Sequence, residues 1–349
     1  MPNDVTDHRT RRLPRFLGRR ASRPVRILSI DGGGIRGILA AMALTELERR
    51  TDRPIADLFD LIAGTSTGAL IALGLTVPDA NGRPRYTARQ VAKLYEVFGP
   101  KVFSRSVWHQ IRAVGNLADG KYPAAGLEDM LSELFGEARL TDSLVDVLVP
   151  SYEIERRIPF FFKSWRAIAR DAYDYSMAQV VRAATAAPTY FEPAHIPADG
   201  DDYYALVDGA LVAYNPGLCA YVEARQLYPD AKDFLMVSLG TGQLTRRLAY
   251  DEAKDWGAAR WAEPIFSIMC DASAAAVDHQ LERILPPGPH GLRRYYRLQV
   301  RLDTGSDDMD DASSTNLRVL KLVGEDMLLR NRARLRTLSQ HLADYAELG

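Results

Sequence analysis

The segment Asp31-Gly32-Gly33-Gly34-Ile35-Arg36-Gly37 follows a short apolar run, and Gly64-Thr65-Ser66-Thr67-Gly68 follows a second one about thirty residues later. Each segment ends a strand-like stretch and opens a helical pattern of apolar residues. The second has the form G-x-S-x-G of a nucleophile elbow, a sharp strand-to-helix turn that exposes a serine hydroxyl. The first places backbone N–H groups at a helix N-terminus, where they can bind a developing oxyanion. Together the two segments predict a serine acyl hydrolase.

Ser66 is the candidate nucleophile, and Gly64 and Gly68 are the small neighbours that a tight elbow needs. The five-residue pattern is weak evidence on its own, because short patterns also arise by accident. Here it lies between the apolar runs 61–63 and 69–73, which read as the strand and the helix of an elbow. This placement favours the catalytic interpretation.

A serine nucleophile needs a base that accepts its proton. No histidine stands in a context that marks it as catalytic: His279 lies within a helical pattern, and His290 lies in a loop rich in proline and glycine. Asp208 is the better candidate, because it ends an apolar strand-like run and is followed by Gly209 and Ala210. In an open parallel sheet the carboxyl ends of the strands form the active edge, which would place Asp208 beside the serine. The alternative is that Asp208 only caps the following turn or helix.

Strand-like and helix-like segments alternate along most of the chain. Strand candidates are 25–30, 59–63, 147–153, 159–163, 204–207 and 234–239, and helix candidates include 35–50, 67–75 and 176–186. This alternation predicts an α/β fold with a mainly parallel, doubly wound sheet. Towards the C-terminus, 294–302 is expected to form a late strand, and 313–346 one helix with a single apolar face.

The composition is that of an ordinary globular protein, with 47% hydrophobic residues, 26% charged residues and a formal net charge of −1 over 349 residues. Such a charge gives no general attraction for nucleic acid, so DNA and RNA are not expected as partners. Two cysteines provide no disulfide framework, which favours a cytoplasmic location. No apolar run approaches the length that spans a bilayer.

The N-terminal segment is strongly basic: residues 1–26 hold eight arginines against Asp4 and Asp7. We expect residues 1–24 to form a disordered tail, or alternatively an arm that binds anionic lipid headgroups. The stretch 97–112 combines basic and aromatic side chains. It is either an ordinary packed insertion or a lid that contacts a membrane.

The three motifs DGGGIRG at 31–37, GTSTG at 64–68 and DGA at 208–210 occur in this order, and this set resembles the patatin-like phospholipases. Softer matches at 183–191, 215–216 and 237–242 extend the resemblance over about 25–242. The resemblance implies a three-layer α/β/α fold with a mainly parallel central sheet. It also implies that the domain hydrolyses acyl esters of lipids without a metal or other cofactor. Because no linker rich in proline, glycine or serine divides the chain, we expect 25–349 to form one catalytic domain with a C-terminal helical extension.

Carried over to this chain, the resemblance implies that Ser66 is the nucleophile and that Asp208 is the general base, acting directly or through a water. Arg36 would help to hold the glycine-rich loop. Ala210 stands where a third glycine is frequent in the family, and alanine is a common variant there. The oxyanion hole would be formed by the backbone amides of three glycines: Gly32, Gly33 and Gly34.

The partners implied by this resemblance are a phospholipid membrane surface, contacted peripherally, and a second copy of the chain. Bacterial patatin-like proteins include antiphage effectors that a cyclic dinucleotide switches on, and the motifs fit such an effector as well as a constitutive housekeeping lipase. A nucleotide-binding protein that uses DGGGIRG as a phosphate cradle is a different alternative. It is disfavoured because the loop lacks the Walker lysine pattern and because GTSTG and DGA would have no role.

Overall fold

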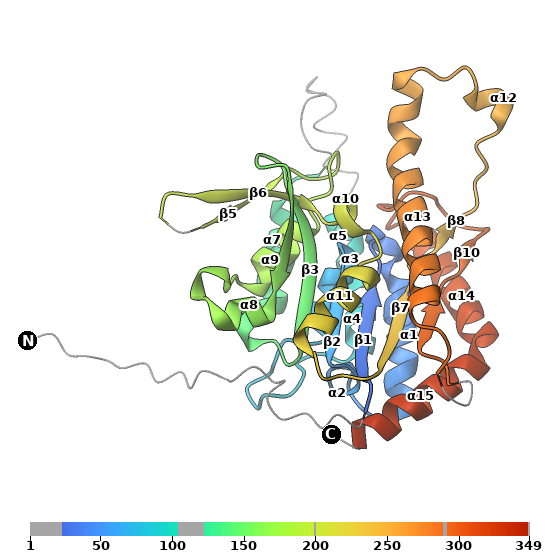
Figure 1. Ribbon diagram of the computed structural model, residues 1–349. Helices are drawn as coiled ribbons and strands as arrows, with labels where there is room; N and C mark the ends of the chain where they lie inside the picture. Colours follow the sequence, from blue (N-terminus) through green and yellow to red (C-terminus); the bar gives the residue numbers. More distant parts are fainter. Residues whose placement is uncertain (1–22, 104–121, 199, 289–291, 348–349) are drawn as a thin grey trace, which may run out of the picture.

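The computed structural model describes residues 23–103, 122–198, 200–288 and 292–347 (Figure 1). At its centre is an eight-stranded sheet with the order β5-β6-β3-β2-β1-β7-β9, in which β4 pairs with β3 off this path. The strands are β1 (Val25–Ile30), β2 (Leu61–Gly64), β3 (Asp146–Glu153), β4 (Ile158–Lys163), β5 (Ala194–Pro197), β6 (Tyr203–Asp208), β7 (Phe234–Leu239) and β9 (Tyr295–Leu298).

Helices cover both faces of this sheet. They are α1 (Gly37–Thr51), α2 (Ile55–Leu58), α3 (Thr67–Gly74), α4 (Ala88–Val97), α5 (Gly99–Val102), α7 (Ala125–Phe135), α8 (Ser164–Ala169), α9 (Met177–Ala184), α10 (Ala210–Ala213), α11 (Gly217–Leu227), α12 (Tyr250–Ala253), α13 (Ala258–Ile284), α14 (Ser314–Arg330) and α15 (Arg332–Glu347). Short 3-10 turns are η1 (Gly34–Arg36), η2 (Leu140–Asp142) and η3 (Asp171–Tyr173).

The central strand β1 is buried along its whole length, and its side chains alternate between two cores. Leu28 and Ile30 belong to the larger core, which includes apolar residues of α1, α3, α4 and α9. Val25 and Ile27 belong to a second core, which includes residues of α11 and the end of α13. A strand that is buried on both faces requires a helical layer on each side. The predicted three-layer α/β/α fold is therefore confirmed.

The parallel part of the sheet consists of β3, β2, β1, β7 and β9. The strands β4, β5 and β6 pair antiparallel at one side of it. The predicted mainly parallel centre is thus present. The antiparallel side is a feature that the alternation of strands and helices did not predict.

Two predictions for the C-terminal region are wrong, because each predicted element is divided into two in the structure. The expected strand 294–302 is divided into β9 and β10 (Arg301–Leu302), and β10 pairs with β8 (Gln243–Leu244) in a separate small sheet. Between them, the Gln299 side chain accepts hydrogen bonds from the N–H groups of Gly242 and Val300. The expected helix 313–346 is two helices, which meet at Asn331.

The basic segment and the expected lid are described only in part. Residues 1–22 of the expected tail and 104–112 of the expected lid lie outside the described residues. Arg23, which the tail was expected to include, pairs instead with the buried carboxylate of Asp60 at 3.1 Å. Among the described helices, none has the length and apolar character needed to cross a membrane.

Candidate active site

Ser66 lies in the turn between β2 and α3, with a half-buried side chain and backbone angles φ 55° and ψ −120°. A positive φ is strained for any residue but glycine, and this strain is typical of a nucleophile elbow. A Cβ atom on Gly64 would strike the carbonyl oxygen of Gly68, and one on Gly68 would strike that of Ile30. The close approach of strand and helix at this turn therefore requires both glycines.

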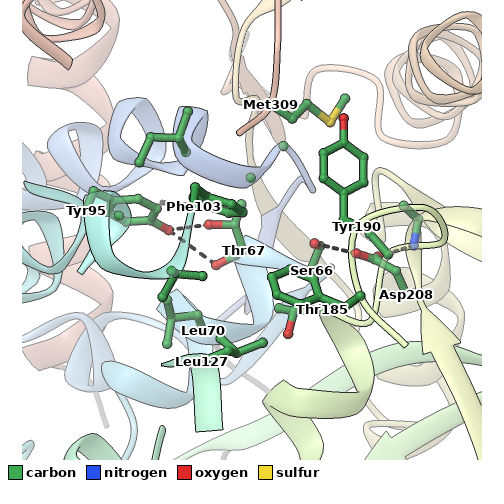
Figure 2. A pocket seen from close by; sticks show the side chains of 18 of the residues that line it. Ser66, Thr67, Leu70, Tyr95, Phe103, Leu127, Thr185, Tyr190, Asp208 and Met309 are labelled. Atoms are coloured by element: carbon green, nitrogen blue, oxygen red, sulfur yellow. Dashed lines mark hydrogen bonds between the residues drawn. The ribbon is translucent and has the colours of Figure 1, made fainter. Parts of the chain in front are cut away.

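Asp208 is the last residue of β6, and its carboxylate faces Ser66 (Figure 2). Asp208 Oδ2 accepts a hydrogen bond from Ser66 Oγ at 2.6 Å, while Oδ1 accepts one from the N–H of Ala210 at 2.8 Å. A Cβ atom on Gly209 would strike the carbonyl oxygen of Pro150, so this glycine lets the chain turn directly after the aspartate. The serine and the carboxylate are thus in direct contact, without a water between them.

The route by which Asp208 reaches the serine differs from the predicted one. It was expected at the carboxyl end of a parallel strand, but β6 is antiparallel to β3. Strand β3 continues past its pairing with β2, and β6 returns along this extension until Asp208 lies opposite Ser151. Asp208 therefore lies beyond the end of β2, which is where the elbow begins.

Burial raises the pKa of Asp208 from 3.8 to about 7, although the hydrogen bonds from Ser66 and Ala210 act in the opposite direction. Only 2% of the Asp208 surface is exposed. A base is most effective when its pKa lies near the working pH. At neutral pH this carboxyl group can both accept a proton and release it.

The three glycines of the loop after β1 do not have equal roles. The N–H of Gly32 donates to the carbonyl oxygen of Tyr214 at 3.0 Å, so the prediction that it donates to an oxyanion is wrong. Gly33 and Gly34 line the same pocket as Ser66, and within the described ranges their N–H groups donate to no acceptor. Gly34 has φ 56°, and its Cβ would strike the carbonyl oxygen of Met309. Two donors of the predicted oxyanion hole therefore remain available.

Arg36 is completely buried and contacts the loop through Tyr214, whose hydroxyl group accepts a hydrogen bond from Arg36 Nη2 at 3.2 Å. Thr241 Oγ1 donates a short hydrogen bond to the carbonyl oxygen of Gly32. Gly32 is thus held at its N–H by Tyr214 and at its carbonyl by Thr241. The contact at the carbonyl fixes the orientation of the Gly32–Gly33 peptide, whose N–H is the first of the two free donors.

A buried ion pair anchors the start of the same loop. Arg297, on β9, donates to both carboxylate oxygens of Asp31 at 3.0 and 2.6 Å, and to Ser238 Oγ at 2.8 Å. Asp31 is completely buried. The pair therefore ties the loop to both β7 and β9.

Three residues that hold this loop were not predicted from the sequence: Tyr214, Thr241 and Arg297. Thr241 lies in the 237–242 match and Tyr214 directly precedes Asn215-Pro216, so both stand beside segments that had been noted as similar to the family. Arg297 carried no local signal. Each of these side chains reaches the loop from far along the chain, and a local pattern contains no such information.

An apolar pocket opens beside the two dyad residues, and Figure 2 shows Ser66 and Asp208 at one side of it. Within the pocket wall, Thr67 and Tyr95 join their hydroxyl groups in a hydrogen bond of 2.5 Å. The apolar lining includes Leu70, Leu94, Phe98, Val102, Leu127, Met130 and Phe191. The apolar character of this lining suits a hydrocarbon chain.

The other titratable groups considered in the sequence do not join this site. In the described part of the chain the pocket is lined by no histidine, and His279 is exposed on α13. His290 lies outside the described residues. Among the described residues, no three or more His, Cys, Asp or Glu side chains form a group that could hold a metal ion.

Comparison with known proteins gives one consistent family. Residues 28–218 match the family model described as patatin-like phospholipase. The chain is 32% identical to "Patatin-like protein 1" of Arabidopsis thaliana, over 87% of this chain and 81% of that protein. It is 33% identical to "Patatin-2-Kuras 2" of Solanum tuberosum, over 87% of this chain and 83% of that protein.

Two further comparisons qualify this result. "Probable inactive patatin-3-Kuras 1" of Solanum tuberosum is 32% identical over 88% of this chain and 87% of its own length. The solved structure of VipD from Legionella pneumophila aligns with 87% of this chain and 67% of that one, at 12% identity and a TM-score of 0.34. That likeness is too low to support any functional statement.

Proposed function

We propose that this chain, which belongs to the patatin-like phospholipase family, hydrolyses acyl esters of lipids with Ser66 as nucleophile and Asp208 as base. Membership of the family supports lipid hydrolase activity. Since one relative is named as probably inactive, membership alone does not establish catalysis by this chain. The observation that carries the proposal is the 2.6 Å hydrogen bond from Ser66 to Asp208 beside an apolar pocket.

In the first half of the reaction, Asp208 accepts the proton of Ser66 Oγ while that oxygen attacks the ester carbonyl carbon. The carbonyl oxygen becomes negative and accepts hydrogen bonds from the N–H groups of Gly33 and Gly34. One such donor contributes about 3–4 kcal/mol of transition-state stabilisation in a well-studied hydrolase. The C–O bond of the ester then breaks, and the leaving alcohol takes the proton from Asp208.

The second half releases the acyl group from Ser66. A water molecule enters, Asp208 accepts its proton, and the resulting hydroxide attacks the acyl carbon. The same two N–H groups of Gly33 and Gly34 bind the second oxyanion. When the bond to Ser66 Oγ breaks, Asp208 returns the proton to that oxygen. The products are a fatty acid and the regenerated dyad.

The pocket contributes binding energy for the acyl chain. Transfer of each methylene group from water into apolar surroundings stabilises the complex by about 0.8 kcal/mol. We therefore expect short esters to bind more weakly than long ones. The apolar lining thus favours lipids, rather than small water-soluble esters, as the substrate class.

Fatty acid release from phosphatidylglycerol vesicles by the purified protein tests the proposal. The variant Ser66→Ala removes the nucleophile, and Ser132→Ala, which changes an exposed serine of α7, is the matched control. We expect wild-type and Ser132→Ala protein to release fatty acid and Ser66→Ala to release none. Activity of the Ser66→Ala variant near the wild-type rate would exclude Ser66 as the nucleophile.

Control by a cyclic dinucleotide rests on the resemblance to the family alone and stays a prediction, as does self-association. A panel of cyclic dinucleotides added to the same assay tests the first of these. Activity without any nucleotide would assign the protein to constitutive lipases, whereas activity with only one nucleotide would indicate a gated enzyme.

A further inference from the structure

The exposed face of α13 beside the active site is unusually apolar for a surface helix. Ile265, Ile268 and Met269 are 46%, 38% and 55% exposed. Only one charged residue, Asp271, occurs within 264–277. A helix at a protein surface ordinarily presents charged and polar side chains to water. Large exposed apolar patches of this kind mark sites of contact with another molecule or with a membrane.

The single charge does not change the character of this face. Asp271 is half-buried, and its carboxylate interacts with the backbone of Leu244, on β8, by a hydrogen bond. Further along the helix, the exposed positions are occupied by small uncharged residues: Ala272, Ser273, Ala275 and Ala276. The apolar surface of α13 therefore extends over several turns.

Exposed apolar residues also adjoin the pocket lining along the chain. At three separate places a residue that lines the pocket is followed or preceded in the chain by an exposed apolar residue. The pairs are Phe98 with Val97, Ala210 with Leu211, and Phe266 with Ile265. We call the exposed set Val97, Leu211, Ile265, Ile268 and Met269 the apolar rim.

The position of α13 in the fold agrees with this placement. The helix α10, which begins at Ala210, the last residue of the acid motif, packs against α13. In Figure 1, α13 extends past the end of β7 on the side where α10 lies. The apolar rim therefore lies on chain segments that border the pocket of Ser66 and Asp208.

We propose that the apolar rim docks on the surface of a lipid bilayer, from which an acyl chain enters the pocket; this inference rests on the proposed lipid hydrolase function. A stable protein partner seated on the rim would cover the pocket mouth and exclude the substrate. A bilayer covers the same apolar side chains and also supplies the acyl chain. The pocket and the rim then form one continuous apolar path.

The charges near the rim indicate how it binds. Residues 244–263, which lead into this part of α13, contain four basic and four acidic residues. This segment has no net charge with which to select anionic headgroups. Docking therefore depends on insertion of apolar side chains, which salt does not weaken, rather than on electrostatic attraction, which salt screens.

The test measures flotation of the protein with phosphatidylcholine vesicles at about 0.1 M and about 0.5 M NaCl, which differ in how strongly they screen charges. The rim variants are Ile268→Glu and Met269→Glu. Their matched controls are Leu322→Glu and Leu329→Glu, because these leucines are 60% and 71% exposed on α14. We expect wild-type protein and controls to float at both salt concentrations, and each rim variant to bind roughly tenfold more weakly.

Several results would overturn the proposal: rim variants that float like the wild type, a wild type that salt releases from vesicles, or a wild type that binds only anionic vesicles. A light-scattering result would also overturn the proposal. If the wild type were a dimer that Met269→Glu converts to a monomer, this face would instead bind a second copy of the chain. Hydrolysis of a soluble short-chain ester separates the two proposals. Protein that floats through the rim but hydrolyses neither lipid nor ester, with or without the panel of cyclic dinucleotides, would refute the hydrolase function and leave the docking surface standing.

Discussion

Ser66 Oγ lies 2.6 Å from Asp208 Oδ2, although 142 positions separate the two residues in the chain. Two backbone features produce this contact. The elbow holds Ser66 in a strained turn with φ 55°. Strand β6 runs back along the extension of β3 and ends at Asp208, whose N–H donates to the carbonyl oxygen of Ala186 at 3.0 Å. Nucleophile and base are therefore positioned by the sheet before a substrate arrives.

The raised pKa of Asp208 predicts how activity depends on pH. Only the ionised carboxylate can accept the serine proton, and burial raises its pKa to about 7. We therefore expect kcat/KM for a soluble ester to increase with pH until about 7 and to level off above it. Asp208→Asn is expected to lose activity at least about a thousandfold at every pH. A rate that stays constant down to about pH 5, well below that pKa, would contradict Asp208 as the base.

The same raised pKa predicts that the contribution of Asp208 to stability, unlike activity, decreases as the pH rises. The pKa of Asp208 is about 7 in the folded protein against 3.8 as the ordinary value, so the folded state binds the proton more tightly. Its contribution to the free energy of unfolding is most favourable below about pH 4 and is lost as pH rises through about 7. Asp208→Asn, which carries no charge, is then expected to be more stable than wild type at about pH 8, by at most about 4 kcal/mol.

Thermal unfolding of Asp208→Asn and wild-type protein between about pH 5 and about pH 8 measures this effect. Asp230→Asn, which changes an exposed aspartate, is the control and should show no such trend. We expect the difference in Tm between Asp208→Asn and wild type to increase with pH. A difference that is constant over this range would show that burial does not penalise the charged form of Asp208.

The elbow and the acid motif could be predicted from sequence because both depend on local requirements. Gly64 and Gly68 are needed where a strand and a helix approach closely, and that need is visible in five consecutive residues. The partner of the Gly32 amide could not be predicted in this way. Tyr214 and Thr241 hold that glycine across 182 and 209 positions, and the pairing is decided by the packing of the whole sheet.

Thr241 is predicted to act as a positioning residue for the oxyanion donors. Thr241→Val keeps the shape of the side chain but removes the hydroxyl that donates to the carbonyl of Gly32. The peptide that leads to Gly33 and Gly34 is then less restrained, so the donors fit the transition state less well. We expect kcat to fall by about 10- to 100-fold, with KM changed less than about twofold.

The matched variant for this prediction is Thr241→Ser, which retains the hydroxyl and should recover most of kcat. If both Thr241→Val and Thr241→Ser lost activity equally, the methyl group and its packing would be the important feature instead. A rise in KM without loss of kcat would also contradict a role that is confined to the transition state.

Removing only one partner of the ion pair between Asp31 and Arg297 is predicted to lower the free energy of unfolding. Arg297→Met leaves the buried Asp31 carboxylate without its two hydrogen bonds from the guanidinium group. Loss of one partner from a buried pair typically destabilises a protein by about 3–5 kcal/mol. Replacing both partners, as in Asp31→Asn with Arg297→Met, removes the uncompensated charge and should recover part of that loss.

Urea unfolding of the two single variants and the double variant completes this thermodynamic cycle. Because Asp31 directly precedes the glycine loop, the double variant tests a second point. If the pair also orients the loop, the double variant will recover stability but not kcat, since the tie from the loop to β9 is still absent. Full recovery of both would limit Asp31 and Arg297 to a role in folding. Additive losses in the two single variants would contradict the direct coupling that their 2.6 Å contact implies.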